Sequence, residues 1–222
     1  MKNYAIIVAG GSGSRMKAEV PKQFLLLNGK PVLMHTIEAF HRSAVRPDII
    51  LSLNSDFISY WKELCLHYQF NIPHKIIEGG RQRFDSVKNA LNLVQESSII
   101  AVHDGVRPIT SNNLISRCFS IAAEKGTAIP VINSRDSLRK KEGQFTTALK
   151  REDILIVQTP QVFKSELLIE AYKQAFSEVF TDDASVVEQA GHIITVTEGD
   201  PRNIKITWPE DLEVAALLQN KT

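Results

Sequence analysis

Short apolar segments alternate with helical patterns along most of this 222-residue chain, and this alternation limits its fold more than any other feature. The apolar segments have the length of β-strands, and we expect strands over residues 4–8, 48–53, 74–78, 98–103 and 127–132. Apolar side chains at helical spacing predict intervening helices over residues 31–41, 57–68, 83–94 and 111–125. Strands that alternate with helices predict an α/β fold, Rossmann-like and doubly wound, with a mostly parallel sheet.

The middle of the chain departs from this alternation. Residues 132–155 are polar and highly charged, with a turn signal at Glu142–Gly143, and they lack an apolar face of their own. A structureless loop of this length is uncommon in a compact domain. We therefore predict that residues 133–154 form a protruding β-hairpin arm that docks on a second subunit. The alternative is a solvated loop.

Helical patterns return over residues 165–176 and 183–191, followed by a predicted strand at 193–197 and a C-terminal helix from Pro209. The sequence contains no internal repeat, low-complexity tract or linker. We expect a single domain over residues 1–222, with the arm inserted in it.

The overall composition argues against several classes of partner. The chain is 43% hydrophobic and 23% charged, and its formal net charge is +1. A nearly neutral chain has no bulk attraction to nucleic acid or to an anionic membrane. No apolar segment approaches the roughly 18 residues of a membrane span, and the start does not resemble a signal peptide. With the isolated cysteines Cys65 and Cys118, these features predict a cytoplasmic protein with reduced thiols.

The first predicted strand runs directly into a glycine-rich segment, VAGGSGSRM at residues 8–16. A glycine loop between a strand and a helix can wrap phosphates, because its backbone N–H groups approach anions closely. The segment lacks the third glycine of the dinucleotide-binding motif, and no G-K-[ST] follows as in a P-loop. Arg15 within the loop and Lys22 just beyond it are cations that suit a triphosphate.

A second group of polar residues follows the strand predicted at 98–103, in VHDGVRP. Ligands of open α/β sheets bind outside the carboxyl ends of the strands. Asp104 could hold Mg²⁺ there, and a turn or helix-capping role is the alternative. Arg107 could clamp an anion, and we expect His103 to be a structural neighbour rather than a general base.

Three further segments carry candidate residues. EGGRQRFDSV, at residues 78–87, contains a second glycine turn that could bring backbone against a flat base, with side-chain donors behind it. TDDASVVE, at residues 181–188, is typical of a helix N-terminus, and helix capping is sufficient to explain its aspartates. NIKIT, at residues 203–207, alternates as a strand or extended segment does, with Lys205 at its centre.

Seven segments occur in one order between residues 9 and 207: AGGSGSRM, PKQF, GG-x-x-R-x-x-SV, VHD-x-x-RP, TPQ-x-F, TDDAS and NIKIT. Together they resemble the 2-C-methyl-D-erythritol 4-phosphate cytidylyltransferases, enzymes of the non-mevalonate isoprenoid pathway. The resemblance implies cytidylyl transfer from CTP to methylerythritol phosphate with release of diphosphate and with Mg²⁺ as cofactor. It also implies a fold of the nucleotide-diphospho-sugar transferase type and a homodimer joined by the arm.

The same resemblance implies a role for individual residues. The catalytic cations would be Arg15, Lys22 and Lys205, and the metal ligand would be Asp104. The acceptor would contact Arg107, Ser137, Arg151 and Thr159, of which Ser137 and Arg151 would reach across the dimer from the arm. CTP would contact Ala9, Gly10, Gly11, Gly13, Gly79, Gly80, Arg83, Ser86 and Gly105.

Three positions depart from the family pattern: Gly105–Val106 stand where the family often has two alanines, Ser137 where it often has threonine, and Gly10 where many members have alanine. The AGG form at residues 9–11 also occurs in ribitol-5-phosphate cytidylyltransferases and in sugar-nucleotide pyrophosphorylases. A ribitol-5-phosphate or other sugar- or polyol-phosphate cytidylyltransferase is therefore an alternative, although R-x-x-SV and TDDAS-x-VE favour the methylerythritol enzyme. A regulatory nucleotide-binding domain without turnover is a second alternative, which the complete set of predicted catalytic cations disfavours.

Overall fold

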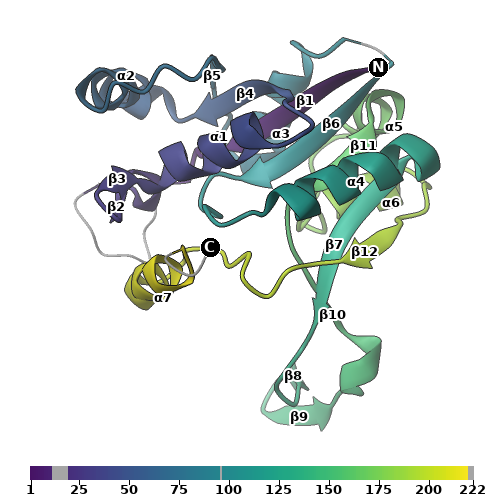
Figure 1. Cartoon of the computed structure of the whole chain (residues 1–222). Coiled ribbons are helices and arrows are strands. Elements are labelled where there is room, and N and C mark those ends of the chain that lie inside the picture. The colour runs from purple at the N-terminus through teal and green to yellow at the C-terminus, as the bar shows by residue number, and fades with distance from the viewer. Residues whose placement is uncertain (12–19, 96, 220–222) are drawn as a thin grey trace.

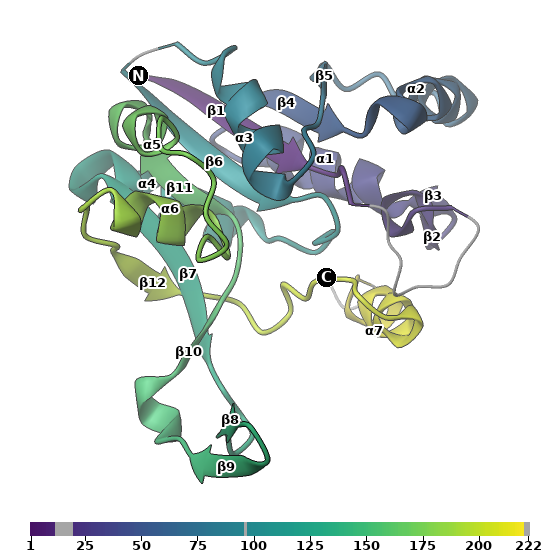
Figure 2. The same cartoon turned by 180° about the vertical axis from the view of Figure 1, so that it is seen from behind.

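The computed structural model describes residues 1–11, 20–95 and 97–219 of the chain. Its centre is a mixed sheet with helices on both faces (Figures 1 and 2). In spatial order the strands are Leu155–Val157 (β10), Thr127–Asn133 (β7), Gln161–Lys164 (β11), Ser98–Asp104 (β6), Lys2–Val8 (β1), Asp48–Leu53 (β4) and Lys75–Glu78 (β5), and Val196–Glu198 (β12) also pairs with β7. Neighbours from β6 to β5 run parallel, so the predicted α/β fold with a mostly parallel sheet is confirmed.

Alternate residues of β1 show why helices cover both faces of the sheet. Ala5 and Ile7 are buried in one apolar cluster with side chains of α1, α2 and α4, whereas Tyr4 and Ile6 are buried in another with α3, α5 and α6. A strand that is buried on both faces has a nearly continuous apolar sequence, as β1 has. The helices are Val32–Arg42 (α1), Ile58–His67 (α2), Arg83–Leu91 (α3), Asn112–Lys125 (α4), Ser165–Ala171 (α5), Asp183–Gln189 (α6) and Pro209–Gln219 (α7).

The sheet contains a central strand that the sequence analysis does not predict. β11 lies between β6 and β7 and runs antiparallel to both. Its four residues are too few to display a period, although Val162 and Phe163 are fully buried. Some predicted boundaries also move, because apolar spacing continues into the turns. The helices predicted at 83–94 and 165–176 end at Leu91 and Ala171, and the strand predicted at 193–197 lies at Val196–Glu198.

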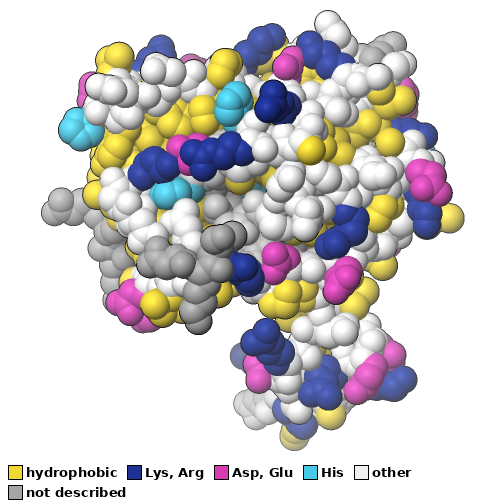
Figure 3. Space-filling model, viewed as in Figure 1, with side chains coloured by type: hydrophobic (Ala, Val, Ile, Leu, Met, Phe, Trp, Pro, Cys, Tyr) yellow, Lys and Arg dark blue, Asp and Glu magenta, His cyan; other side chains and the backbone are white. Residues whose placement is uncertain are grey.

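The predicted arm is a β-hairpin that extends from the sheet beyond β7 and β10 (Figures 1 and 2). Arg139–Glu142 (β8) pairs antiparallel with Phe145–Ala148 (β9), and every residue of both strands is exposed. Gly143 has a φ of 62°, which suits the tight turn between them. Basic and acidic side chains both cover the arm (Figure 3). The hairpin is confirmed, whereas its docking on a second subunit stays a prediction.

The parallel strands bring four chain segments to one edge of the sheet. β1, β4, β5 and β6 end there, so the residues that follow each of them become neighbours. The small hairpin of Leu26–Leu27 (β2) and Lys30–Pro31 (β3) lies near the same edge with α7, where Leu27, Ile206 and Ala215 share an apolar cluster. None of the helices in the described part of the chain is long and apolar enough to cross a membrane.

Gly105 provides a test of how tightly this edge is packed. Its N–H donates to the Val8 carbonyl at 2.9 Å, and a Cβ at this position would lie 2.9 Å from the Ala9 Cβ and 3.1 Å from a Leu33 methyl. We expect Gly105→Ala to lower the free energy of unfolding by about 1–3 kcal/mol through overpacking. Denaturant unfolding measures this, and Gly11→Ala is the matched control, because its Cβ would meet no atom of the described residues within 4 Å. Equal stability of the two variants would contradict the packing explanation.

Candidate active site

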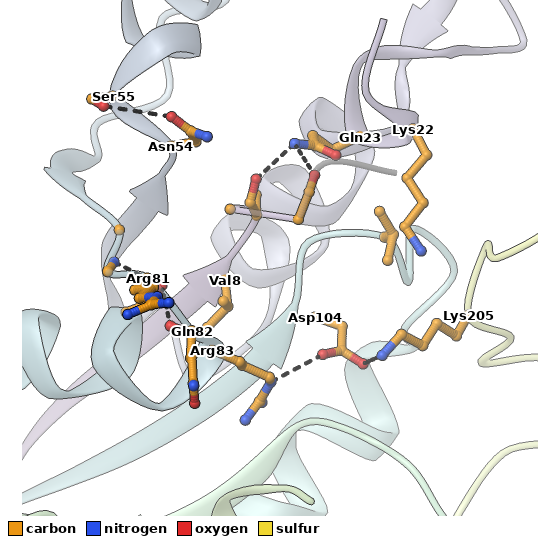
Figure 4. A pocket seen from close by; sticks show the side chains of 17 residues that line it. Val8, Lys22, Gln23, Asn54, Ser55, Arg81, Gln82, Arg83, Asp104 and Lys205 are labelled. Atoms are coloured by element: carbon orange, nitrogen blue, oxygen red, sulfur yellow. Dashed lines mark hydrogen bonds and ion pairs between the residues drawn. The ribbon is translucent and has the colours of Figure 1, made fainter. Parts of the chain in front are cut away.

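A cleft of about 630 Å³ opens at the carboxyl edge of the sheet. Its walls come from the segments after β1, β4, β5 and β6, from the short 3₁₀ helix Lys22–Phe24 (η2), and from the segment before α7. Figure 4 shows the side chains of Lys22, Arg83, Asp104 and Lys205, which come from separate elements and line this one space. Among the described residues that line it, Asp104 is the one carboxylate, and the remaining charges are Lys or Arg. A cleft of this composition suits a polyanionic ligand.

Asp104 stands at the end of β6, and among the described residues it meets three cations. Lys205 Nζ lies 3.0 Å and Arg107 Nε 3.3 Å from its Oδ2, and Arg83 Nε lies 3.6 Å from its Oδ1. Burial by itself raises the pKa of Asp104, but attraction by Arg83, Lys205 and Arg107 outweighs it and holds that pKa well below its ordinary value. The carboxylate is therefore ionised at neutral pH, and it offsets the mutual repulsion of Arg83, Arg107 and Lys205.

Arg83 is held from its other side by a second, fully buried carboxylate. Arg83 Nη2 donates to Asp183 Oδ2 at 2.6 Å, and the Tyr172 hydroxyl donates to Asp183 Oδ1 at 2.6 Å. Burial disfavours a charged Arg83, but Asp183 and Asp104 together raise its pKa above the ordinary value. In TDDAS, therefore, only Asp182 caps α6, through the Ser185 N–H. The capping interpretation is insufficient for Asp183, whose carboxylate orients Arg83.

A buried hydrogen-bond network supports Asp104 from below. Its backbone N–H donates to Thr159 Oγ1 at 3.1 Å, and Asn203 Nδ2 donates to the Thr159 carbonyl at 2.7 Å. Arg107 Nη1 donates to the Asn203 carbonyl at 2.8 Å, so this network also holds the guanidinium that faces Asp104. Burial lowers the pKa of His103 to about 3, so this ring is neutral and bonds to the Thr159 hydroxyl at 3.0 Å. His103 is thus a structural neighbour, as expected.

The second glycine turn is held by its own side chains. Ser86 Oγ accepts from the Gly80 N–H at 3.1 Å and donates to the Gln82 carbonyl at 3.0 Å. A Cβ on Gly80 would lie 2.1 Å from the Asp85 Cβ, so only glycine fits there. The turn and its serine line one cleft together with Ala9, Gly10 and Gly11 of the first glycine segment.

The structure distributes the predicted site residues among four places. Those that line the cleft are Ala9, Gly10, Gly11, Lys22, Gly79, Gly80, Arg83, Ser86, Asp104 and Lys205. Gly105, Arg107 and Thr159 are not among the lining residues, because Gly105 packs against Ala9 and the other two lie in the network around Asp104. Ser137 and Arg151 are exposed on the arm, and Gly13 and Arg15 lie outside the described residues.

Three residues of this arrangement are absent from the sequence-based site: Gln23, Asp183 and Asn203. All three are polar and almost fully buried. A buried polar side chain has no signature in a single sequence, because the same residue types are mostly found at the surface. The one available signal is that each belongs to a segment already selected, namely PKQF, TDDAS or NIKIT. NIKIT itself is not a strand, and the segment is fixed by Asn203 and by the Ile206 N–H, which donates to the Val106 carbonyl.

The oxygen ligands available in the cleft suit Mg²⁺ only in combination with a bound substrate. Within residues 1–11, 20–95 and 97–219 no group of three or more His, Cys, Asp and Glu side chains could hold a metal by itself. Mg²⁺ is commonly bound by one or two carboxylates together with substrate phosphates and water. The ionised Asp104 in the cleft fits this mode, provided that a phosphate-bearing ligand supplies further oxygen atoms.

Comparisons with known proteins point to one family. A family model described as 2-C-methyl-D-erythritol 4-phosphate cytidylyltransferase matches residues 3–220. A protein of that name from Bacteroides fragilis is 49% identical over 214 residues, which cover 96% of this chain and 98% of the relative. One from Azobacteroides pseudotrichonymphae is 50% identical over 219 residues, which cover 98% of each chain.

Solved structures extend the similarity to the fold. A 4-diphosphocytidyl-2C-methyl-D-erythritol synthase from Anaerococcus prevotii aligns with a TM-score of 0.83 at 25% identity, covering 99% of this chain and 96% of that one. The 2-C-methyl-D-erythritol 4-phosphate cytidylyltransferase of Thermus thermophilus aligns with a TM-score of 0.78 at 29% identity, covering 99% of this chain and 100% of that one.

The buried pair between Arg83 and Asp183 leads to a prediction. Asp183→Asn removes the charge that faces Arg83 inside the protein, and we expect it to lower the free energy of unfolding by roughly 3 kcal/mol or more. The same variant should also weaken nucleotide binding, because Arg83 loses its orientation toward the cleft. Tyr172→Phe is the control, since it deletes one hydrogen bond and keeps the ion pair. Denaturant unfolding and titration calorimetry measure both effects; an equal loss of CTP affinity in the two variants would contradict the assignment.

Proposed function

The chain belongs to the 2-C-methyl-D-erythritol 4-phosphate cytidylyltransferase family, and we propose that its cleft transfers a cytidylyl group from CTP to 2-C-methyl-D-erythritol 4-phosphate. The products are CDP-methylerythritol and diphosphate, in the synthesis of isoprenoid precursors. The observation that carries this assignment to particular residues is the convergence of Lys22, Arg83 and Lys205 on one cleft beside Asp104.

The proposed reaction is a direct displacement at phosphorus. An oxygen of the acceptor phosphate attacks the α-phosphorus of CTP and forms a new P–O bond. The bond from the α-phosphorus to the bridging oxygen breaks, and its electron pair leaves with diphosphate. The acceptor is already an anion at neutral pH, so neither a covalent enzyme intermediate nor a general base is required. The protein has to bring two anions together and to stabilise the charge that develops between them.

We assign the charges of the cleft to that task. Lys22 and Lys205 would contact the reacting phosphates, and the segments around Gly10 and Gly80 would hold the nucleotide through their backbone. When bound, Mg²⁺ would neutralise phosphate charge next to Asp104. Arg107 and Thr159 are buried, so we propose that they act through Asp104 rather than by touching the acceptor. Arg15 and Gly13 keep the roles that the family resemblance implies.

We further propose that the protein is a cytoplasmic homodimer joined by the arm, and that Ser137 and Arg151 bind the acceptor in the partner's cleft. Phe145 at the tip of the arm is 80% exposed, and Leu155, Ile156 and Val157 at its base are each more than 40% exposed. Large apolar side chains that are left exposed are common at protein–protein interaction surfaces. Cys65 and Cys118 are both free thiols, which is consistent with a reducing compartment.

A coupled assay for diphosphate release tests the reaction and its acceptor. The purified protein is supplied with Mg²⁺ and CTP, and then with methylerythritol phosphate or ribitol 5-phosphate. We expect release with methylerythritol phosphate, which is the acceptor that the relatives' names carry. Release only with ribitol phosphate would favour the alternative polyol-phosphate enzyme. Binding of CTP with no release on either acceptor would favour a regulatory domain.

Mixing two variants that are each impaired at low acceptor concentration tests whether a cleft and an arm from different chains act together. We expect Lys22→Ala to lower turnover by about 10²–10³-fold, because it removes a cation from the developing charge. Arg151→Ala should mainly raise KM for the acceptor. In a mixed dimer one cleft has Lys22 and faces an intact Arg151 from the partner, so co-refolding the two variants should restore part of the wild-type activity.

The controls for this experiment are Lys22→Ala and Arg151→Ala, each co-refolded with itself and assayed at the same low acceptor concentration, where neither should gain activity. No recovery in the mixture, with dimers demonstrated by sedimentation, would show that the arm does not serve the partner's cleft.

A further inference from the structure

Gln23 is one of the residues that line the cleft, and it lies beside Ala9 and Gly11 of the glycine-rich segment. It follows Lys22 in η2, and its side chain is 2% exposed. Its Nε2 donates to the Ala9 carbonyl at 2.7 Å and approaches the Gly11 carbonyl at 3.3 Å, the two dashed contacts beside Gln23 in Figure 4. One buried amide therefore binds the backbone of the glycine loop at two points.

The other end of Gln23 is attached to a rigid part of the protein. Phe24, the next residue of η2, is 3% exposed, and its ring lies 5.2 Å from that of Tyr60 and 5.7 Å from that of Phe57. Because η2 is anchored in this aromatic cluster, the Gln23 side chain can hold the backbone at Ala9 and Gly11 in a fixed position. The loop itself contains glycines, which by their nature do not restrict backbone rotation.

The contact also determines where a backbone donor points. The peptide bond between Ala9 and Gly10 is trans, so its C=O and its N–H point in opposite directions. With the carbonyl held by Gln23, the Gly10 N–H is directed away from Gln23. Gly10 lines the cleft, and a Cβ on it would lie 3.7 Å from the Ser86 hydroxyl on the facing turn. Rotation of this peptide group would replace a donor with a carbonyl oxygen, which repels phosphate.

We propose that Gln23 is a positioning residue for the nucleotide: by binding the carbonyls of Ala9 and Gly11, it keeps the backbone N–H of Gly10 directed toward the phosphates of CTP. This inference rests on the proposed function for the identity of the ligand. Gln23 acts through the loop and does not touch the reacting atoms, whereas its neighbour Lys22 supplies a charge to the same site.

Gln23→Met tests the inference, because methionine retains the length of the side chain and removes its donor. We expect the Kd for CTP, measured by titration calorimetry with Mg²⁺, to rise about 10-fold, the size expected for one buried hydrogen-bonding group. KM for the acceptor should change less than about twofold. Gln95→Met is the matched control, since Gln95 is exposed and precedes the opposite, amino-terminal end of β6. An unchanged Kd for CTP, or an equal rise in Kd and acceptor KM, would overturn the proposal.

Gln23→Glu provides a second readout that a purely structural role would not move. Its carboxylate would face two carbonyl oxygens, and only the protonated form can donate to the Ala9 carbonyl. We expect the CTP affinity of Gln23→Glu to recover relative to Gln23→Met as the pH is lowered from about 8 to about 6, because such surroundings raise the pKa of a carboxyl group. A constant ratio of the two affinities over this range would contradict the proposed donor. Circular dichroism confirms that each variant is folded at the temperature used.

The outcomes separate this inference from the proposed reaction. Diphosphate release by the wild-type protein together with undiminished CTP binding by Gln23→Met would overturn the inference alone. Gln23-dependent CTP binding without diphosphate release would overturn the reaction and support the inference. A wild-type protein that does not bind CTP would overturn both.

Discussion

The arrangement of the cleft depends on the attraction between one carboxylate and three cations. Arg83, Arg107 and Lys205 come from α3, from the turn after β6 and from the segment before α7, and they would repel one another without the anion between them. Asp183, which is fully buried, forms a second ion pair with Arg83 and further compensates its positive charge. The cations in and around the cleft still outnumber these two carboxylates, so the site retains positive charge for a polyanionic substrate.

The polar scaffold below Asp104 explains why this arrangement is rigid. Thr159 and Asn203 are buried, and each uses both its side chain and its backbone to connect the end of β6 with the segment that carries Lys205. A buried polar network is stabilising only when its donors and acceptors have hydrogen-bond partners, and those of Thr159 and Asn203 have them. The chain that returns from the arm through β10 continues directly into Thr159 and β11. The arm and the network around Asp104 are therefore separated by very few residues along the backbone.

Much of the fold could be predicted because it depends on local apolar patterns. The strand over Asp48–Leu53 and the start of α7 at Pro209 are where the sequence places them, since strand-length apolar runs and a proline at a helix start are local signals. β11 could not be predicted in this way. Four residues carry no period, and their assignment as a central strand depends on β6 and β7, which flank them only after the chain has folded.

The sequence by itself determined the α/β class, the hairpin arm and the segments from which the site is built, because glycine turns, apolar periods and charged residues at strand ends are properties of neighbouring residues. Only the tertiary structure decided which members of those segments face the cleft. In the folded protein Arg107 and Thr159 contact Asp104 rather than the cleft. Asp183 pairs with Arg83, and the Gln23 amide donates to the Ala9 carbonyl. The reason is physical: a polar side chain acquires its role from partners that are distant along the chain, and the low polarity around a buried group makes those few contacts decisive.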